Sequence, residues 1–237
     1  MSWVILPCKD FVRAKTRLSG LLAPHERRAL MQAMVEDVLT VVAGHPDIAG
    51  GVLVSDDPAA ALLAANYGLS HLDERELAVS GLNAAVSAAA AMLAAQGVNE
   101  VLVLHGDVPA VASAEIDQLL AATRSRGQRM VLVGDRCASG TNGLWYRGAP
   151  PRFCYGEDSL EQHRSQVAGT PVLALHGLGL DVDDPADLAA LISYLEIRPA
   201  LAPRTRQVLE TEGLAARVRA VMDTVVPEGT DSAGVSS

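Results

Sequence analysis

Three aspartates in two short stretches of the sequence have the chemistry and spacing to hold a divalent cation. Asp107 follows the apolar run VLVLHG, which indicates a buried strand that ends at a carboxylate. Ligands of open α/β sheets bind at the carboxyl ends of the strands, where a carboxylate can hold a metal ion. Asp181 and Asp183 flank Val182, and alternate residues of an extended segment point to the same side. The three side chains together offer the oxygen ligands that Mg²⁺ prefers.

Each acidic position also has a purely structural explanation. Asp107 can stabilise a turn before Pro109, and the residue types alone leave both roles open. Asp184, which follows the second pair, is better explained as the N-cap of a helix that begins at Pro185. Asp181 lies too far upstream to cap that helix, so the metal role stays the more informative hypothesis for it.

A basic segment follows the first apolar run. Lys9, Arg13, Lys15 and Arg17 fall within nine residues of a chain whose formal net charge is -9. Because a polyphosphate in the first crevice of the sheet would need countercharge, we interpret this segment as facing phosphate. The alternative is a solvated basic loop. The motifs GxxxxGK[ST] and GxGxxG are absent, so neither a P-loop nor a dinucleotide-binding unit is supported.

Two glycine-containing turns offer backbone N–H groups to an anion. The first is Gly140-Thr141-Asn142, and the second runs from Gly156 to Ser159. Either turn could bind a phosphate or carboxylate group, and either could be an ordinary surface turn. His163 follows the second turn, and we interpret it as a residue on a helix surface rather than a phosphate contact.

The composition argues against several other classes of protein. An acidic chain with 3% aromatic residues lacks the basic face and stacking side chains of a nucleic-acid binder. Three cysteines form no CxxC pair and no even set, so we expect neither a disulfide framework nor a zinc site, and a reduced cytoplasmic location. No targeting segment and no apolar run of membrane-spanning length is evident, so we expect no membrane partner.

Apolar periodicity predicts the scaffold of an α/β fold, a mostly parallel sheet flanked by helices. The pattern predicts strands at 4–6, 51–55, 101–104 and 130–133, and helices at 24–42, 56–68, 81–96, 113–124, 185–196 and 204–222. The Gly- and Pro-rich stretch 134–180 indicates an irregular insertion or lid. We expect one domain over 1–225 and a disordered tail over 226–237.

Six motifs, in order and across nearly the whole chain, together resemble one known family. They are AKTRL, GLNAA, GDVP, DRxxSGTNGL, FxYGxxSxxxH and LDVDDPADL. This combination is similar to the 2-phospho-L-lactate guanylyltransferases of coenzyme F420 biosynthesis, which have a single-domain nucleotidyltransferase-like (Rossmann-like) fold. Members use GTP and, by lineage, 2-phospho-L-lactate, phosphoenolpyruvate or 3-phospho-D-glycerate. The chain departs from the family pattern at Trp145-Tyr146 and at Cys154, which bears on the choice of acid.

The resemblance implies roles for residues that the motifs contain. The implied ligands of Mg²⁺ are Asp107, Asp181 and Asp183. Binding of the phosphorylated acid falls on Thr141, Gly156 and Ser159. The catalytic residues facing the triphosphate are Lys15 and Arg17, and Asn83 binds the nucleotide. From the basic segment and from the strand end, we expect Lys9 and Gly106 to be nucleotide-binding residues as well.

The reaction that the resemblance implies is nucleotidyl transfer. A phosphate oxygen of the acid attacks the α-phosphate of GTP and pyrophosphate leaves, with no general base because the acceptor is already an anion. The expected partners are GTP, a small phosphorylated carboxylic acid and the enzyme that consumes the guanylylated product. A homodimer is compatible with the sequence. Two alternatives stay open: transfer to a pterin or sugar phosphate, and a non-catalytic GTP-binding module. A silent module would be expected to lack one of the three aspartates, and all are present.

Overall fold

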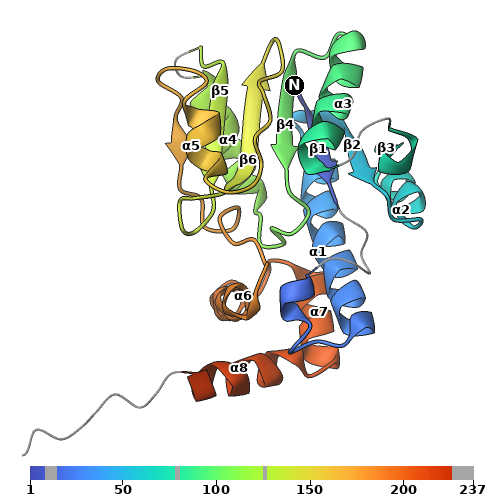
Figure 1. Ribbon diagram of the computed structural model, residues 1–237, viewed down its shortest axis with the longest axis vertical. Coiled ribbons are helices and arrows are strands. Elements are labelled where there is room, and N and C mark those ends of the chain that lie inside the picture. Colours follow the sequence, from blue (N-terminus) through green and yellow to red (C-terminus); the bar gives the residue numbers. More distant parts are fainter. Residues whose placement is uncertain (9–14, 78–80, 125–126, 226–237) are drawn as a thin grey trace, which may run out of the picture.

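A seven-stranded mixed sheet forms the centre of the molecule in the computed structural model (Figure 1), which describes residues 1–8, 15–77, 81–124 and 127–225. Strand order is β3-β2-β1-β4-β6-β5-β7. The strands are β1 Ser2–Pro7, β2 Ile48–Ser55, β3 Ser70–Asp73, β4 Glu100–Leu104, β5 Met130–Gly134, β6 Thr141–Arg147 and β7 Val172–Leu173. β6 runs antiparallel to β4 and β5, whereas the other pairs are parallel. The carboxyl ends of β1, β2, β3 and β4 therefore meet at one edge.

Helices cover both faces of the sheet. The described helices are α1 Pro24–Gly44, α2 Ala60–Asn66, α3 Leu82–Ala95, α4 Ser113–Arg124, α5 Ser159–Arg164, α6 Pro185–Ile197, α7 Pro203–Thr211 and α8 Leu214–Val225, with short 3-10 helices η1 Thr16–Leu18 and η2 Glu74–Glu76. Of these, α6, α7 and α8 lie beyond one end of the strands, where α7 packs against α1 (Figure 1). Side chains alternate across the pleat, so Val4 and Leu6 join the core under α1 and α4, while Ile5 joins the core under α3 and α5. No helix in the described ranges is long and apolar enough to cross a membrane.

The parallel half of the sheet follows the predicted pattern closely. The strands predicted at 4–6, 51–55, 101–104 and 130–133 are confirmed as β1, β2, β4 and β5. The helix predicted at 24–42 is α1, and its 3.6-residue periodicity buries Leu30, Met34 and Val38. Pro24 occupies its first turn, where a missing N–H costs no hydrogen bond. This half of the fold is set by local sequence pattern.

Residues 134–180 are more regular than predicted. Thr141–Arg147 forms β6 between β4 and β5, and α5 and β7 follow, so part of the predicted irregular insertion belongs to the sheet and its helices. Trp145 of β6 is fully buried, and its indole N–H donates to Ser2 Oγ at 3.0 Å. The sequence obscured this strand because it begins with Thr-Asn-Gly, residue types that are typical of turns. Thr141 and Asn142 therefore belong to a strand and not to a tight turn.

The end of the described chain also differs from its prediction. The single helix predicted over 204–222 is two helices, α7 and α8. Gly213 lies between them with a φ of +62°, a conformation that glycine adopts without strain and that ends a helix. β3 had no counterpart among the predicted strands. The tail predicted over 226–237 lies outside the described residues.

Candidate active site

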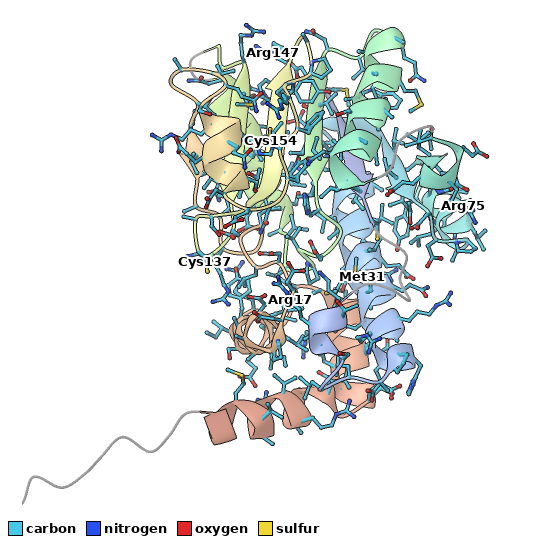
Figure 2. All side chains as sticks on the ribbon, viewed as in Figure 1. Arg17, Met31, Arg75, Cys137, Arg147 and Cys154 are labelled. Carbon is cyan, nitrogen blue, oxygen red and sulfur yellow. The ribbon has the colours of Figure 1, made fainter. Side chains whose placement is uncertain are left out.

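A cavity of about 640 Å³ opens at the edge where the parallel strands end. Its wall contains several of the residues predicted from sequence: Lys15, Arg17, Gly106, Asp107, Gly156 and Asp183. Arg17 and Met31 mark this edge of the sheet in Figure 2, and Arg147 marks the opposite edge. The position agrees with the general rule that ligands of α/β sheets bind outside the carboxyl ends of the strands.

Asp107, Asp183 and Lys15 form the charged centre of the cavity, which we call the carboxylate–lysine cluster. Lys15 Nζ donates to Asp107 Oδ2 at 2.6 Å and to Asp183 Oδ1 at 2.9 Å. The Lys15 side chain is only 5% exposed. Burial by itself lowers the pKa of Lys15, but the two carboxylates raise it by more, so the ammonium stays charged. The cluster is thus a buried cation held between two carboxylates.

The backbone of Lys15 is itself unusual. Its φ of 57° and ψ of 42° place it in the left-handed region, immediately before η1. A non-glycine residue is seldom found there, and the surrounding structure must hold it in place. The two ion pairs of the Lys15 side chain contribute to that restraint. Strained positions of this kind tend to cluster at functional sites.

Asp107 has the properties of a cation ligand. Burial raises its pKa, but Lys15 and then His105 lower it by more, and the net pKa lies below the usual range. Its Oδ1 atom is buried and has no hydrogen-bond partner among the described residues. A buried carboxylate oxygen without a partner is costly unless a donor or cation satisfies it. The backbone also links Asp107 to the second acidic stretch, because Val182 N–H donates to its carbonyl oxygen at 3.2 Å.

Asp181 bonds to a different partner from Asp183. Asn142 Nδ2 donates to Asp181 Oδ1 and to the carbonyl oxygen of Leu178, each at 3.0 Å. Burial, together with the negative charges of Asp107 and Asp183, raises the pKa of Asp181 to about 6. The oxygens of the three aspartates do not all lie within 4.8 Å of one another. The carboxylates are therefore neighbours, but they are not preassembled around a single point.

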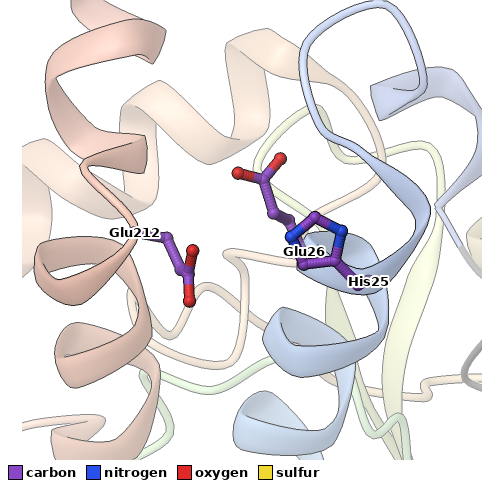
Figure 3. A group of neighbouring side chains, drawn as sticks. All are labelled: His25, Glu26 and Glu212. Carbon is purple, nitrogen blue, oxygen red and sulfur yellow. The ribbon is translucent and has the colours of Figure 1, made fainter.

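A second group of metal-ligating residue types lies where α1 begins and α7 ends (Figure 3). His25, Glu26 and Glu212 each bring one ligand atom within 4.8 Å of the others. Glu26, however, already accepts hydrogen bonds from Ala23 N–H and from Arg217, each at 2.7 Å. His25 and Glu212 are exposed. Because both Glu26 oxygens are used in capping α1 and in an ion pair, we assign no site to this group.

Thr141, Ser159, His163 and the backbone of Cys154 form a buried set of hydrogen bonds, which we call the histidine network. Thr141 N–H donates to Ser159 Oγ at 3.0 Å, and Cys154 N–H donates to His163 Nε2 at 2.8 Å. Because Nε2 accepts, Nδ1 carries the proton and donates to Thr141 Oγ1, 3.0 Å away. His163 is fully buried, and burial lowers its pKa to about 4. The prediction that His163 lies on a helix surface was wrong.

The histidine network lies behind the cavity wall. Of the residues predicted to hold the acid, Gly156 lines the cavity, whereas Thr141 and Ser159 are 3% and 2% exposed and do not. They fix the segment that carries Gly156 against β6. The buried position of His163 was not predicted, although Ser159 and His163 are four residues apart and so share one face of α5. That spacing is the signal that could have revealed it.

Asn83 holds the same segment from the opposite side. Its Nδ2 donates to the carbonyl oxygen of Tyr155 at 3.0 Å, and Tyr155 N–H donates to its Oδ1 at 2.7 Å. Asn83 lies in the first turn of α3, next to Gly81 and Leu82, which line the cavity. In this structure its amide positions the segment before Gly156. Contact with a nucleotide stays a prediction.

Gly106 and Arg17 line the cavity, each for its own reason. A Cβ atom on Gly106 would lie 3.0 Å from Val35 Cγ2 and 3.3 Å from Leu6 Cδ2. A side chain at 106 would therefore be tight against the packing beneath the strand end, and contact with a nucleotide stays a prediction. Arg17, in η1, is exposed at the cavity. Lys9, also predicted to bind the nucleotide, lies outside the described residues.

The fold and the cavity at its strand ends define a nucleotidyltransferase-like α/β protein. The structure resembles a candidate nucleotide-diphospho-sugar transferase from Desulfovibrio desulfuricans G20, with a TM-score of 0.68, 18% identity, and coverage of 93% of this chain and 98% of that one. It also resembles a nucleotidyl transferase from Methanothermobacter thermautotroptrophicus, with a TM-score of 0.52, 15% identity, and coverage of 86% and 99%. These likenesses confirm the predicted fold.

Within that class, the chain belongs to the family described as guanylyl transferase CofC like, which matches residues 2–196. A protein from Conexibacter woesei is 37% identical over 215 residues, which cover 88% of this chain and 95% of that one. Another from Mycobacterium sp. (strain KMS) is 38% identical over 191 residues, covering 79% and 84%. Both carry the name phosphoenolpyruvate guanylyltransferase. The protein is a nucleotidyltransferase, and the family expected from the six motifs is confirmed.

Proposed function

We propose that the protein transfers GMP from GTP to the phosphate of a small three-carbon phospho-acid, releases pyrophosphate, and acts in coenzyme F420 biosynthesis. The observation that supports this proposal most is the carboxylate–lysine cluster, placed in a cavity at the carboxyl ends of the strands. The name shared by the relatives favours phosphoenolpyruvate as the acid. The other candidates are 3-phospho-D-glycerate and 2-phospho-L-lactate.

The chemistry requires positioning and charge neutralisation more than proton transfer. An oxygen of the acceptor phosphate forms a bond to the α-phosphorus, and the bond from that phosphorus to the bridging oxygen of the β-phosphate breaks. Because the attacking oxygen is already anionic, no general base has to remove a proton. Lys15 and Arg17 supply positive charge at the cavity, and Gly156 offers its backbone at the wall. These groups suit a reaction in which negative charge accumulates on phosphate oxygens.

Mg²⁺ is the cofactor that we propose for this site. Asp107, Asp181 and Asp183 would hold it, and when bound it would neutralise charge on the phosphates. The residues fit a cation, because Asp107 Oδ1 lacks a partner among the described residues and two of the carboxylates already share the Lys15 ammonium. Lys15 and the metal ion would therefore compete for the same two carboxylates, Asp107 and Asp183. Release of Lys15 from the carboxylates would make its ammonium available to the triphosphate.

One experiment tests the proposed function directly. The purified protein is incubated with GTP, Mg²⁺ and each of the three acids separately, pyrophosphate release is followed, and the guanylylated product is identified by mass. We expect release with an acid present and none with GTP alone. Pterin and sugar phosphates serve as comparison acceptors. Absence of pyrophosphate release with all three acids would contradict the proposal. Pyrophosphate release with a pterin or sugar phosphate alone would show that this compound, and not a phospho-acid, is the acceptor.

A further inference from the structure

Asn142 of β6 contacts both segments that carry the proposed metal ligands. Its side-chain Nδ2 donates to Asp181 Oδ1 at 3.0 Å. Its backbone carbonyl oxygen accepts a hydrogen bond from the N–H of His105, two residues before Asp107, at 3.3 Å. These contacts arise because β6 begins beside the end of β4, its antiparallel neighbour. One residue therefore joins the end of β4 to the acidic stretch before α6.

The side-chain amide of Asn142 has one orientation that fits its surroundings. Its Nδ2 lies 3.0 Å from two acceptors, the carbonyl oxygen of Leu178 and Asp181 Oδ1. A carbonyl group and an ionised carboxylate accept hydrogen bonds and donate none, so the amide nitrogen and not the amide oxygen has to face them. Each of the two N–H bonds then has its own acceptor. The side chain is thus a bridge of fixed direction between a backbone turn and a carboxylate.

The turn at the Leu178 end of this bridge is itself fixed. Gly177 N–H donates at 2.7 Å to Oε1 of Glu115, a buried carboxylate of α4. A Cβ atom on Gly177 would lie 2.1 Å from the carbonyl oxygen of Ala110, so the turn packs directly against another backbone segment. Leu178 is fully buried. Asn142 therefore connects Asp181 to a turn whose own position is well determined.

Asp183 is held by different contacts from those of Asp181. Its backbone N–H donates at 3.0 Å to Oδ2 of Asp187 in the first turn of α6, and its side chain accepts from Lys15 Nζ. Asp181 lies two residues further from α6, and its carboxylate accepts from Asn142. Hydrogen bonds from neighbouring residues set the orientation of metal ligands and so affect metal affinity. Asn142 is in the place to provide such a hydrogen bond for Asp181.

Direct contact of Asn142 with a substrate is a poorer explanation. Asn142 is 4% exposed and is not among the described residues that line the cavity. Both N–H bonds of its amide are used within the protein. Any effect of Asn142 on the reaction therefore has to act through Asp181 or through the backbone segments that it joins.

We propose that Asn142 is a positioning residue of the cation site: it holds the Asp181 carboxylate in the orientation in which it binds a divalent cation together with Asp107 and Asp183. The inference rests on the proposed function, which includes that cation. It also gives a role to the asparagine of the motif DRxxSGTNGL, because this motif then supports the acidic motif LDVDDPADL.

The test is the dissociation constant of Mn²⁺, measured without nucleotide or acid in the wild type, Asn142→Ala and Ser2→Ala. Ser2→Ala is a matched control, because it also removes a buried side-chain hydrogen bond to β6, the one from Trp145 Nε1, at the other end of the strands. Loss of a hydrogen bond to a metal ligand weakens metal binding by about 10–100-fold, and we expect a loss of that size in Asn142→Ala. Ser2→Ala should bind Mn²⁺ like the wild type, although both variants should unfold at lower urea concentrations.

The dependence of turnover on Mg²⁺ provides a second readout. Asn142→Ala should need about tenfold more Mg²⁺ than the wild type to reach half of its maximal rate of pyrophosphate release. Its rate at saturating Mg²⁺ should stay within about threefold of the wild type, because excess cation compensates for weaker binding. A purely structural role would leave the half-saturating Mg²⁺ concentration unchanged.

An unchanged Mn²⁺ affinity in Asn142→Ala would overturn the inference, and so would equal losses of affinity in Asn142→Ala and Ser2→Ala. If Asn142→Ala does not fold by circular dichroism, Asn142→Thr replaces it, because threonine suits a strand and its single hydroxyl donor cannot satisfy both acceptors. A wild type that binds no Mn²⁺ would overturn the inference as well. Absence of pyrophosphate release by the wild type would defeat the proposed function, whereas release with an unchanged Mn²⁺ affinity in the variant defeats this inference alone.

Discussion

The carboxylate–lysine cluster and the histidine network are both built from polar residues of sequence motifs, yet they differ in where their polar atoms are used. In the cluster, Asp107 keeps a buried oxygen without a partner among the described residues, and Lys15 adopts a left-handed backbone at the cavity. In the network, Thr141, Ser159 and His163 bond to one another and to backbone. This difference indicates that a motif residue can bind a ligand only where its polar atoms are not already used in hydrogen bonds within the protein.

The largest effect is expected from Asp107→Asn, which keeps the size of the side chain and removes its charge. We expect pyrophosphate release to fall by about 10²–10³-fold, the usual loss when one charge-stabilising group is removed from an active site. Unfolding in urea should remain cooperative with a loss of stability, because the buried Lys15 ammonium loses one of its two partners and keeps only Asp183. Turnover close to that of the wild type would return Asp107 to the role of a turn residue.

A smaller effect should separate two adjacent aspartates. Asp183 bonds to Lys15, so Asp183→Asn should lower turnover by about tenfold, roughly 1.4 kcal/mol of transition-state stabilisation, at unchanged stability. Asp184 accepts from Ala186 N–H and Asp187 N–H as the N-cap of α6, so Asp184→Ala should leave turnover unchanged and cost about 1 kcal/mol of unfolding free energy. Equal effects of the two variants on turnover would contradict an active-site role for Asp183 that Asp184 does not share.

For the histidine network we expect an effect on stability rather than on chemistry. His163→Ala leaves Thr141 Oγ1 and Cys154 N–H without their partner. This should lower the free energy of unfolding in urea by about 1–3 kcal/mol. Turnover of the folded fraction should change by less than about threefold, because none of the residues of the network lines the cavity. A loss of turnover as large as that of Asp107→Asn would place His163 in the reaction itself.

The same network makes a prediction about pH. Burial lowers the pKa of His163 to about 4, below its ordinary value of 6.5. Between these values the unfolded chain binds a proton that the folded protein does not, so stability is full above about pH 6.5 and falls as the pH drops toward 4. Wild type and His163→Ala should therefore differ in the slope of unfolding free energy against pH within this window. Parallel slopes would show that His163 is not held neutral.

The smallest effect is expected at Asn83, which lies between the two regions. Asn83→Ala removes two hydrogen bonds to the Tyr155 backbone and so loosens the segment before Gly156. We expect the KM of the acid to rise by about 2–10-fold, the value of one or two net hydrogen bonds, with the affinity for GTP unchanged. A loss confined to GTP affinity would instead support the direct nucleotide contact predicted from the sequence.

Much of the scaffold could be predicted from the sequence, because the apolar period of each element is local. The run VLVLHG revealed both a buried strand and its end, and parallel topology then brings Asp107 near the end of β1. Pro185 and the aspartate before it revealed the start of α6 for the same local reason. The alternation of Asp181 and Asp183 around Val182 revealed the second acidic stretch, which the structure links to Asp107 through Val182 N–H.

What could not be predicted depends on contacts between distant residues. β6 is stabilised as an internal strand by its neighbours β4 and β5, although it begins with turn-forming residues. The burial of His163 follows from its bonds to Thr141, 22 residues away, and to Cys154. The tight space at Gly106 comes from Val35 of α1, which no local pattern reveals. Each of these features depends on contacts that exist only in the folded protein, so local sequence patterns do not reveal it.

The most direct test of the account is whether a divalent cation binds where Lys15 now lies. Mn²⁺ is titrated, without nucleotide, into the wild type, Asp107→Asn and Lys15→Met, and its dissociation constant is measured for each protein. Because Lys15 Nζ bonds to Asp107 at 2.6 Å and to Asp183 at 2.9 Å, its removal should free both carboxylates. We predict tighter Mn²⁺ binding in Lys15→Met and weaker binding in Asp107→Asn than in the wild type. Unchanged affinity in all three proteins, or weaker binding in Lys15→Met, would contradict the account.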